Sequence, residues 1–386
     1  MIHQHFKTPQ QGGAIRSYYL AKALADRGHR VVMITSFSGK KHKTESMEGI
    51  EIHYLPIKYD NRFKFYARGW AFIMFIVKGT AMASKFRDFD RCYAISVPLT
   101  VGLIARWFRF RFGIPYIFEV GDLWPDAPIQ MGFVKNRFFQ KTLFALERST
   151  YKQATSIVAL SPTIQLSIES KVPGKKTHLI PNMADCEYFG QEQKNPILEN
   201  KFDVSGKFVI AYLGALGVAN GLDYFLACAN AAREAELAAH FILCGDGAMR
   251  EGLRAEAKRL GLQNFSFIDF VNREGVKEIM NVTDAVFVCY KNVPILETGS
   301  PNKFFDGLAS GKLIVINFDG WIKKEIEENH CGIFVDPLQP TDFVKRVAPF
   351  ISDPALLQQF QTASRRLGER KYSRKLLSES FSRLFS

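Results

Sequence analysis

Apolar runs along the chain alternate with longer amphipathic segments in a regular order. Runs of four to six apolar residues, rich in Val, Ile, Phe and Tyr, predict buried strands, and apolar residues spaced three or four apart predict helices between them. Such alternation is typical of a doubly wound parallel sheet. Strands are expected at residues 30–35, 50–55, 91–95, 115–120, 156–160 and 177–180, and again at 208–213, 240–244, 265–270, 285–290 and 313–317.

The alternation stops once and then restarts. Residues 185–206 are polar and irregular, which indicates a linker, and 386 residues suit about two domains. We expect an N-terminal Rossmann-like domain at 1–185 and a C-terminal one at 190–365, facing each other across a cleft. The amphipathic segment 366–386 is expected to pack back on the first domain. The first strand of the N-terminal domain is nearly absent, so either it is very short or the true start lies upstream of Met1.

Composition narrows the environment. The six cysteines form no C-x-x-C pair, which argues for a reducing compartment and against a zinc or disulfide framework. The polar N-terminus carries no visible secretory signal. Residues 1–190 hold 27 Lys and Arg against 14 Asp and Glu, whereas the remainder of the chain holds 24 of each. The whole excess of +13 therefore lies in the first half, which we expect to meet an anionic partner.

Two segments of that basic half are also aromatic. Residues 70–77 form an apolar run flanked by Arg and Lys, far shorter than the roughly 20 residues that span a bilayer. This run suits either a membrane interface or a core helix with a solvated basic edge, and the sequence leaves both open. Residues 107–112 alternate aromatic and basic side chains, which favours the interface.

One segment of the second half has the pattern of an anion site. An apolar strand at 285–290 precedes Ser300, which suits a helix N-cap, Pro301, which suits the first helical position, and Gly311, which suits the helix end. Lys303 would lie in the first turn, where a cation opposes the helix dipole, with Asp306 on the same face. A bound diphosphate would account for that lysine. A capped helix with a surface Lys–Asp pair remains the alternative.

Four motifs carry a resemblance to a known family. They are Gln10-Gln11-Gly12-Gly13 followed by Arg16, Asp122-Leu123-Trp124-Pro125, Ile180-Pro181-Asn182-Met183-Ala184-Asp185, and the segment from Ser300 to Asp306. With them the chain resembles the family-four retaining glycosyltransferases of the two-Rossmann-domain (GT-B) type. The resemblance is greatest to the O-antigen and capsule branch that includes N-acetyl-fucosamine transferases.

The resemblance implies roles for individual residues. Lys303 would stabilise the leaving diphosphate, and Asp122, or less favourably Glu119, would orient or deprotonate the acceptor hydroxyl. Asp306 stands where the family usually binds the ribose with the second Glu of an E-x7-E element, but Thr298 occupies the first position and Glu297 lies one residue away. The residues expected to bind substrate are Gly12, Gly13, Arg16, Gly214, Gly217, Gly245, Gly247, Val271, Asn272, Glu297, Thr298, Ser300, Pro301, Asn302 and Asp306.

The resemblance also implies partners. We expect a nucleotide-sugar donor, with UDP favoured, a lipid-linked glycan acceptor and an anionic membrane surface, with no metal, cofactor or nucleic acid. The protein would then lie on the inner face of the cytoplasmic membrane. A nucleotide-sugar 2-epimerase of the same fold is an alternative, although its soluble substrate gives no reason for a basic aromatic domain. A non-catalytic glycan- or lipid-binding relative is another, because Ala215 and Asn220 occupy sites where the family often has Arg and Lys.

Overall fold

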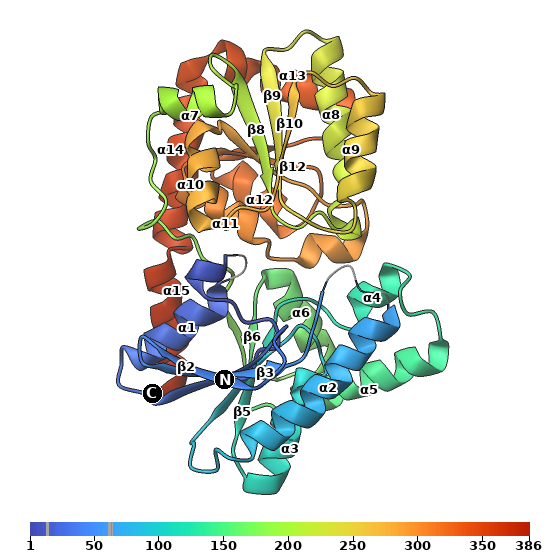
Figure 1. Ribbon diagram of the computed structural model, residues 1–386, viewed down its shortest axis with the longest axis vertical. Coiled ribbons are helices and arrows are strands. Elements are labelled where there is room, and N and C mark those ends of the chain that lie inside the picture. The colour runs from blue at the N-terminus through green and yellow to red at the C-terminus, as the bar shows by residue number, and fades with distance from the viewer. Residues whose placement is uncertain (13–14, 61–62, 64) are drawn as a thin grey trace.

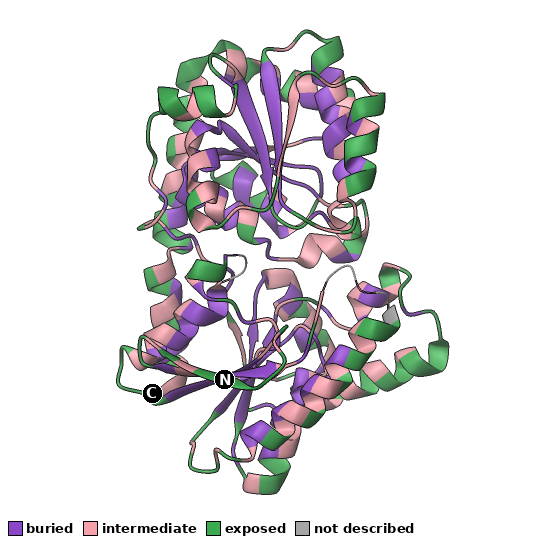
Figure 2. Ribbon diagram, in the orientation of Figure 1, coloured by how far each residue is buried: buried purple, intermediate pink, exposed green. Residues whose placement is uncertain are grey.

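Two α/β domains, one above the other, are joined by a polar linker (Figure 1). The computed structural model describes residues 1–12, 15–60, 63 and 65–386. The expectation of two Rossmann-like domains is confirmed, since each domain is a largely parallel sheet covered by helices on both faces. The central strands of both domains are buried (Figure 2), as their continuous apolar runs require.

The N-terminal sheet consists of two parts joined by a very short strand. Its strands are β1 (Val31–Phe37), β2 (Lys43–Met47), β3 (Ile50–Pro56), β4 (Cys92–Ile95), β5 (Tyr116–Val120), β6 (Ser156–Ala159) and β7 (Thr177–Leu179), in the order β2-β3-β1 and β4-β5-β6-β7. Ile2 and its neighbours bridge the two parts. The Ile2 N–H donates to Tyr93 O of β4 at 2.8 Å, and on the other side Ile34 N of β1 donates to Met1 O at 2.9 Å. The first strand is thus reduced to a single bridging residue in this structure. The polar strand β2, which pairs antiparallel with β3, was not predicted.

Helices cover both faces of this sheet. They are α1 (Arg16–Ala25), α2 (Phe65–Ala83), α3 (Val101–Phe112), α4 (Asp126–Gln130), α5 (Arg137–Gln153) and α6 (Pro162–Lys171), preceded by the 3-10 turn η1 (Pro9–Gln11). The aromatic run at 70–77 lies inside α2, and the run at 107–112 forms the second half of α3. Among the described residues, no helix combines the length and apolar character needed to cross a bilayer.

The C-terminal sheet has the Rossmann strand order. Its strands are β8 (Phe208–Leu213), β9 (Ala239–Cys244), β10 (Phe265–Ile268), β11 (Ala285–Val288), β12 (Leu313–Ile316) and β13 (Gly332–Phe334), all parallel in the order β10-β9-β8-β11-β12-β13. After β8 the chain adds β9 and β10 on one side of that strand, and it then crosses over to add β11, β12 and β13 on the other side. A crevice opens at the carboxyl ends of two such strands, which is where parallel sheets bind ligands.

The helices of this domain bring the chain back to the first. They are α7 (Pro196–Lys201), which lies in the predicted linker, α8 (Leu222–Glu234), α9 (Arg250–Arg259), α10 (Arg273–Val282), α11 (Asn302–Ala309), α12 (Trp321–Glu328), α13 (Pro340–Ser352), α14 (Pro354–Lys371) and α15 (Arg374–Ser382), with 3-10 turns η2 (Val218–Asn220), η3 (Pro294–Thr298) and η4 (Arg383–Phe385). Whereas α14 packs on α11, the next helix, α15, lies against α1 of the N-terminal domain (Figure 1). Leu377 and Phe381 of α15 are buried in the N-terminal core.

The helix after β11 begins later than the sequence indicated. Helix α11 starts at Asn302 with Pro301 as its N-cap, so the assignment of Ser300 as N-cap was wrong. The Ser300 hydroxyl instead accepts a bond from the Asn182 N–H at 3.3 Å, which ties this segment to the end of the N-terminal domain. The predicted end is confirmed, because Gly311 has a φ of 59° and its N–H donates to Leu308 O at 3.0 Å.

Candidate active site

A cleft of about 670 Å³ lies between the domains, at the carboxyl ends of β8, β9 and β11. The N-terminal domain contributes α1 and the turn before it, and the C-terminal domain contributes its strand ends, the start of α10 and the start of α11. Of the predicted substrate-binding residues, the cleft is lined by Gly12, Arg16, Gly214, Gly245, Gly247, Val271, Asn272, Pro301, Asn302 and Asp306, together with Lys303.

Glycines let two turns approach closely at the floor of the cleft. Gly214 follows β8 and Gly245 follows β9, with φ angles of 144° and 147° that other residues rarely adopt. A Cβ on Gly245 would lie 1.9 Å from the carbonyl oxygen of Gly214. The side chain of Lys303 lies against the same turn, since a Cβ on Gly214 would lie 3.5 Å from its Cε. Backbone groups and an amine therefore meet at one point.

The Lys303 ammonium is enclosed by aromatic rings without a carboxylate partner. Its Nζ lies 4.6 Å from the centre of the Tyr212 ring and 5.7 Å from that of Tyr290. Among the described residues, no ion pair or hydrogen bond involves this amine. Burial lowers the pKa of Lys303 to about 8, against weaker opposing effects of Cys289 and Asp306. A half-buried cation in the first turn of a helix is unfavourable in isolation, which indicates that the site is built for an anion.

Asp306 lies one turn further along α11 and is equally unpaired. Burial raises the pKa of this carboxyl to about 7, while the charge of Arg273 acts in the opposite direction. Within the described part of the chain, its oxygens make no hydrogen bond and no ion pair, with Lys303 or with any other residue. An unpaired, half-buried carboxyl facing a cleft can accept hydrogen bonds from the hydroxyls of a ligand.

Several predicted site residues lie outside this cleft, and Gly13 lies outside the described residues. Gly217, Glu297, Thr298 and Ser300 do not line it. The Thr298 hydroxyl turns back to donate to Ile295 O at 2.7 Å within η3, and Glu297 lies beside Gly320. Neither candidate for the first position of the E-x7-E element is therefore directed at the cleft in this structure.

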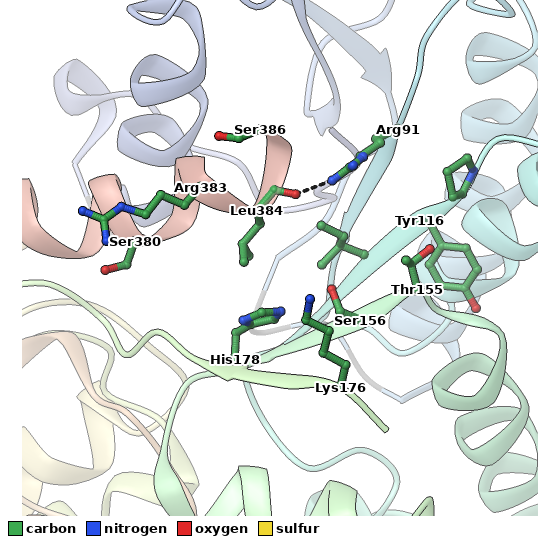
Figure 3. Close-up of a pocket in the computed structure, with 12 residues that line it drawn as sticks. Arg91, Tyr116, Thr155, Ser156, Lys176, His178, Ser380, Arg383, Leu384 and Ser386 are labelled. Carbon is green, nitrogen blue, oxygen red and sulfur yellow. Dashed lines mark hydrogen bonds between the residues drawn. The ribbon is translucent and has the colours of Figure 1, made fainter. Parts of the chain in front are cut away.

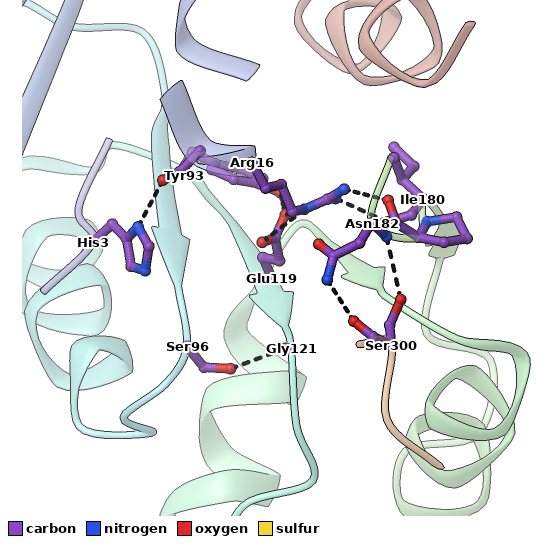
Figure 4. A network of polar contacts seen from close by, with 11 residues as sticks. His3, Arg16, Tyr93, Ser96, Glu119, Gly121, Ile180, Asn182 and Ser300 are labelled. Atoms are coloured by element: carbon purple, nitrogen blue, oxygen red, sulfur yellow. Dashed lines mark hydrogen bonds and ion pairs between the residues drawn. The ribbon is translucent and has the colours of Figure 1, made fainter. Parts of the chain in front are cut away.

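The predicted alternative base, Glu119, belongs to a buried network (Figure 4). Its carboxylate, 2% exposed, pairs with Arg16 at 3.0 Å and also accepts a short bond from the Tyr93 hydroxyl. The same guanidinium donates to the backbone carbonyls of Ile180, at 2.8 Å, and Pro181. These bonds satisfy the carboxylate inside the domain, so Glu119 positions Arg16 and, through it, the start of the linker. The structure thus gives no support to Glu119 as a base.

Asp122 stands on the rim of the N-terminal domain rather than in the wall of the cleft. Its side chain is exposed at the surface, and desolvation by the protein packed around it raises the pKa of this carboxyl. Burial is the main cause that raises the pKa of the Tyr290 phenol, and the negative charge of Asp122, across the domain boundary, raises it further. Two residues later, Trp124 packs edge-on to Phe72 of α2 with ring centres 6.2 Å apart.

Tyr290 was not predicted as a site residue. It lines the cleft two residues beyond β11, and its ring packs on Phe318 at 5.0 Å between centres. Its backbone is fixed by the side chain of Asn317, which accepts from Tyr290 N and donates to Tyr290 O at 2.9 Å each. Among the described residues the phenol oxygen has no hydrogen-bond partner. Its place at the carboxyl end of a central strand was the signal that could have identified it.

A charged cluster that sequence reasoning also missed closes one side of the cleft. Asp185 of the linker pairs with Arg273 of α10 and, at 3.0 Å, with Arg374 of α15. Arg273 also donates to the hydroxyl of Tyr19 on α1 at 2.7 Å. The cluster joins both domains and the linker, and it lies close enough to Asp306 for Arg273 and Asp185 to influence that carboxyl.

A second hollow, of about 610 Å³, lies at the other edge of the N-terminal sheet (Figure 3). It opens beside the amino ends of β5, β6 and β7 and is partly covered by the C-terminal segment. Arg91, Lys176, His178 and Arg383 line it. Parallel sheets bind ligands at their carboxyl ends, so the interdomain cleft is the better candidate.

Both halves of the chain match families of known description. Residues 11–183 match the Glycosyl transferase 4-like domain, and residues 194–367 match the Glycosyl transferases group 1 family. The boundary between these matches falls in the linker that precedes α7.

Two curated relatives are distant. The chain is 18% identical over 234 residues to an alpha-D-kanosaminyltransferase of Streptomyces kanamyceticus, covering 59% of each chain. It is 23% identical over 277 residues to WcaI of Escherichia coli K12, named as a colanic acid biosynthesis glycosyl transferase, covering 70% of this chain and 67% of the relative. The match thus spans less than two thirds of the first relative's length. Neither name supports the N-acetyl-fucosamine branch, which stays a prediction.

Solved structures resemble the whole chain. Sucrose-phosphate synthase from Thermosynechococcus elongatus superposes with a TM-score of 0.81 at 14% identity, covering 100% of this chain and 97% of that one. HepE of Anabaena, solved in complex with UDP-glucose, superposes with a TM-score of 0.73 at 15% identity, covering 100% and 98%. At such identities the likeness establishes the fold, which is the two-domain fold expected from the sequence.

Proposed function

Because the two halves of this chain belong to the glycosyl transferase 4-like and group 1 families, we propose that the protein transfers a sugar from a nucleotide diphosphate to a lipid-linked glycan. Transfer would proceed with retention at the anomeric carbon. One observation carries the proposal: Lys303 and Asp306 face the interdomain cleft, both half-buried and both unpaired within the described residues.

The donor diphosphate would lie over the start of α11. Its negative charge supplies the partner that Lys303 lacks, and the helix dipole and the nearby backbone of Gly214 add to the attraction. When the bond between the sugar and the diphosphate breaks, charge grows on the leaving phosphate. A cation already held beside that oxygen stabilises the transition state without reorganisation. Asp306, one turn away, would accept hydrogen bonds from the ribose hydroxyls.

The donor sugar would meet Tyr290 rather than a glutamate. The resemblance places a Glu at Thr298 or Glu297, but neither side chain lines the cleft. The phenol of Tyr290 does line it and lies next to Lys303, and its oxygen, without a partner among the described residues, can bond a sugar hydroxyl. Since its backbone is held by Asn317, this phenol is already oriented before the ligand arrives.

The acceptor would approach from the N-terminal domain. Asp122 lies on the rim opposite Tyr290, and its raised pKa suits a group that takes up a proton from an attacking hydroxyl. The relative named for colanic acid biosynthesis supports a role in polysaccharide biosynthesis, and the lipid-linked acceptor is what the resemblance implies. The UDP-glucose complex of a protein with this fold supports a UDP-linked donor. We expect activity without added metal, so chelation by EDTA should leave transfer unchanged.

The test is transfer itself. UDP-sugars and GDP-sugars are first screened for thermal stabilisation, since a ligand that binds the folded state raises the unfolding midpoint. Stabilising donors are then incubated with lipid-linked glycan extracts, and the lipid fraction is analysed by mass spectrometry. A mass increase of one sugar, lost in Lys303→Ala but kept in the exposed control Lys324→Ala, is expected. Conversion of the donor without any acceptor would instead indicate the epimerase, and binding without turnover a non-catalytic relative.

A further inference from the structure

The positive charge of the chain is concentrated in three stretches that contain no acid. Residues 61–87, 91–118 and 127–146 carry six, four and three Lys or Arg and no Asp or Glu, and together they account for the entire net charge of +13. These stretches contain α2, α3 and the first part of α5. Helices α2 and α5 each pack against α3, so the three form one layer of the N-terminal domain (Figure 1).

The exposed aromatic side chains are concentrated on the same three stretches. Seven of the eight that are exposed in the described part of the chain lie there: Tyr66, Trp70, Phe110, Phe133, Phe138, Phe139 and Phe144. Trp70 is 65% exposed and Phe110 and Phe138 are 89% and 81% exposed, although burial of such rings is strongly favourable. The outer surface of α2 and α5 is largely exposed (Figure 2). Large aromatic rings that are exposed among Lys and Arg residues, in stretches without Asp or Glu, require an explanation.

On α2 the exposed side chains form a continuous stripe. Tyr66, Trp70, Ile73 and Val77 are spaced four, three and four residues apart, which places them on one face of the helix. The opposite face holds Ala71 and Phe75, which are buried in the core. Arg68, beside the stripe, stacks over Phe133 at 5.6 Å and thereby connects α2 to the segment before α5. The inner face of α2 therefore matches the core-helix alternative for residues 70–77, and the outer face leaves the membrane interface as a prediction.

Of residues 107–112, only Phe110 and the two arginines beside it are exposed as a membrane interface would require. Phe108 is buried, and Trp107 and Phe112 pack partly into the core. Phe110 projects from α3 between the exposed Arg109 and Arg111. At the start of α5, Phe138 lies between Arg137 and Lys141, which are exposed and form no ion pair among the described residues.

We infer that the outer face of α2, α3 and α5 docks on the surface of an anionic lipid bilayer. Aromatic rings are favoured at the boundary between headgroups and acyl chains, and Lys and Arg extend from there to anionic headgroups. A protein partner would need its own acidic complement, whereas a bilayer supplies negative charge over the whole face. The inner side of α2 explains the placement, since Phe72 contacts Trp124 in the loop that carries Asp122.

This proposal deepens the proposed function and rests on it for the acceptor. Docking through α2 would hold the Asp122 loop next to the bilayer, where a lipid-linked glycan presents its sugar. Association with vesicles can nevertheless be measured without any donor or acceptor. The two proposals can therefore fail separately.

The test is sedimentation of the full-length protein with vesicles of phosphatidylglycerol and phosphatidylcholine, compared with pure phosphatidylcholine. We expect binding to the anionic vesicles at low salt, at least tenfold weaker binding to neutral ones, and release at high salt. Trp70→Ser/Val77→Ser/Phe138→Ser should lose at least tenfold in binding, as should Arg137→Glu/Lys141→Glu. Matched exposed changes in the other domain, Ile197→Ser/Leu338→Ser and Lys258→Glu/Lys345→Glu, should bind as the wild type does.

Three outcomes would overturn the docking proposal. They are no binding to anionic vesicles at low salt, equal loss in the control variants, and a wild-type dimer that the α2 variant dissociates while vesicle binding is absent. The last would assign this face to a second copy of the chain. Calorimetry with UDP and GDP on every variant serves as the second readout, because donor binding should not change. If neither nucleotide binds wild type while vesicles do, the docking stands and the proposed function fails.

Discussion

Two pairs of charged residues, one in each domain, are held in opposite ways. In the N-terminal domain, Arg16 and Glu119 are both buried and satisfy each other together with Tyr93 and backbone carbonyls. In the C-terminal domain, Lys303 and Asp306 lie on one helical face and make no such bonds among the described residues. The paired group supports the architecture of the molecule. The unpaired group costs stability and is explained only by a ligand.

This difference has a direct consequence for mutation. Removing a paired buried charge leaves its partner uncompensated, so the fold is destabilised. Removing an unpaired one relieves a desolvation cost, so the fold is stabilised while ligand binding is lost. The following predictions test that contrast, from the largest expected free-energy change to the smallest.

Glu119→Ala should give the largest free-energy change of the four variants, and this change should be a loss of folding stability. Leaving the Arg16 guanidinium buried without its carboxylate is expected to lower the free energy of unfolding by about 3–5 kcal/mol. Urea denaturation measures this change. Glu256→Ala, which removes a carboxylate from an exposed pair with Arg259, should change the midpoint little. Equal effects of the two variants would contradict the assignment of Glu119 to the architecture.

Lys303→Ala should reduce turnover strongly, and unlike Glu119→Ala it should not reduce stability. Loss of one preorganised charge at the leaving group is expected to reduce kcat about 100- to 1,000-fold, or about 2.7–4 kcal/mol. The folded protein should not be less stable, because a half-buried ammonium has been removed. Steady-state kinetics at saturating donor measures the first effect, with Lys324→Ala as control. Unchanged kcat would refute the role of Lys303.

Asp306→Asn should weaken nucleotide binding and stabilise the fold. Losing charge-assisted bonds to the ribose is expected to cost about 1.5–3 kcal/mol of binding, measured by calorimetry. Because the pKa of Asp306 is raised to about 7, the unfolded chain binds fewer protons than the folded one between about pH 4 and 7. Stability therefore falls as pH rises through that window, and the variant should lose this slope. The exposed Asp319→Asn should alter neither quantity, and a stability profile like that of wild type in Asp306→Asn would oppose the assignment.

Tyr290→Phe should have the smallest effect and a selective one. Removing one hydrogen bond to the sugar is expected to reduce kcat/KM for the nucleotide sugar by about 0.5–1.5 kcal/mol, or roughly two- to twelvefold, while the affinity for the free nucleotide stays constant. Tyr224→Phe, whose hydroxyl donates to Asp336 O inside the domain, is the matched control and should leave kcat/KM unchanged. Equal losses for nucleotide and nucleotide sugar would place Tyr290 away from the sugar.

Much of the fold could be predicted from local pattern. The continuous apolar runs marked the buried parallel strands, and Gly311 marked the end of α11, since a φ of 59° there favours glycine. The polar strand β2 escaped because it is an exposed edge strand without an apolar run. Ser300 was misassigned because its bond is to Asn182, 118 residues away, and such a partner leaves no local signal.

The site was predictable where one segment supplies it and not where several converge. Lys303 and Asp306 are three residues apart on a helix that follows a strand, so their shared face could be read from the sequence. Tyr290 and the cluster of Asp185, Arg273 and Arg374 depend on which strand ends and helices meet across the two domains. Glu119 shows the limit of a residue's place in the sequence, because only its partners in the fold show that the carboxylate is already used.

The most direct test of the account is the pH dependence of nucleotide binding. Calorimetry with UDP and GDP between pH 7.5 and 9.5 avoids titration of the terminal phosphate, whose pKa is near 6. Because the pKa of free Lys303 is about 8, affinity of wild type should fall above that pH, approaching tenfold per unit, whereas Lys303→Met should bind more weakly and without this dependence. The same falling affinity in Lys303→Met would contradict the claim that this unpaired lysine holds the diphosphate.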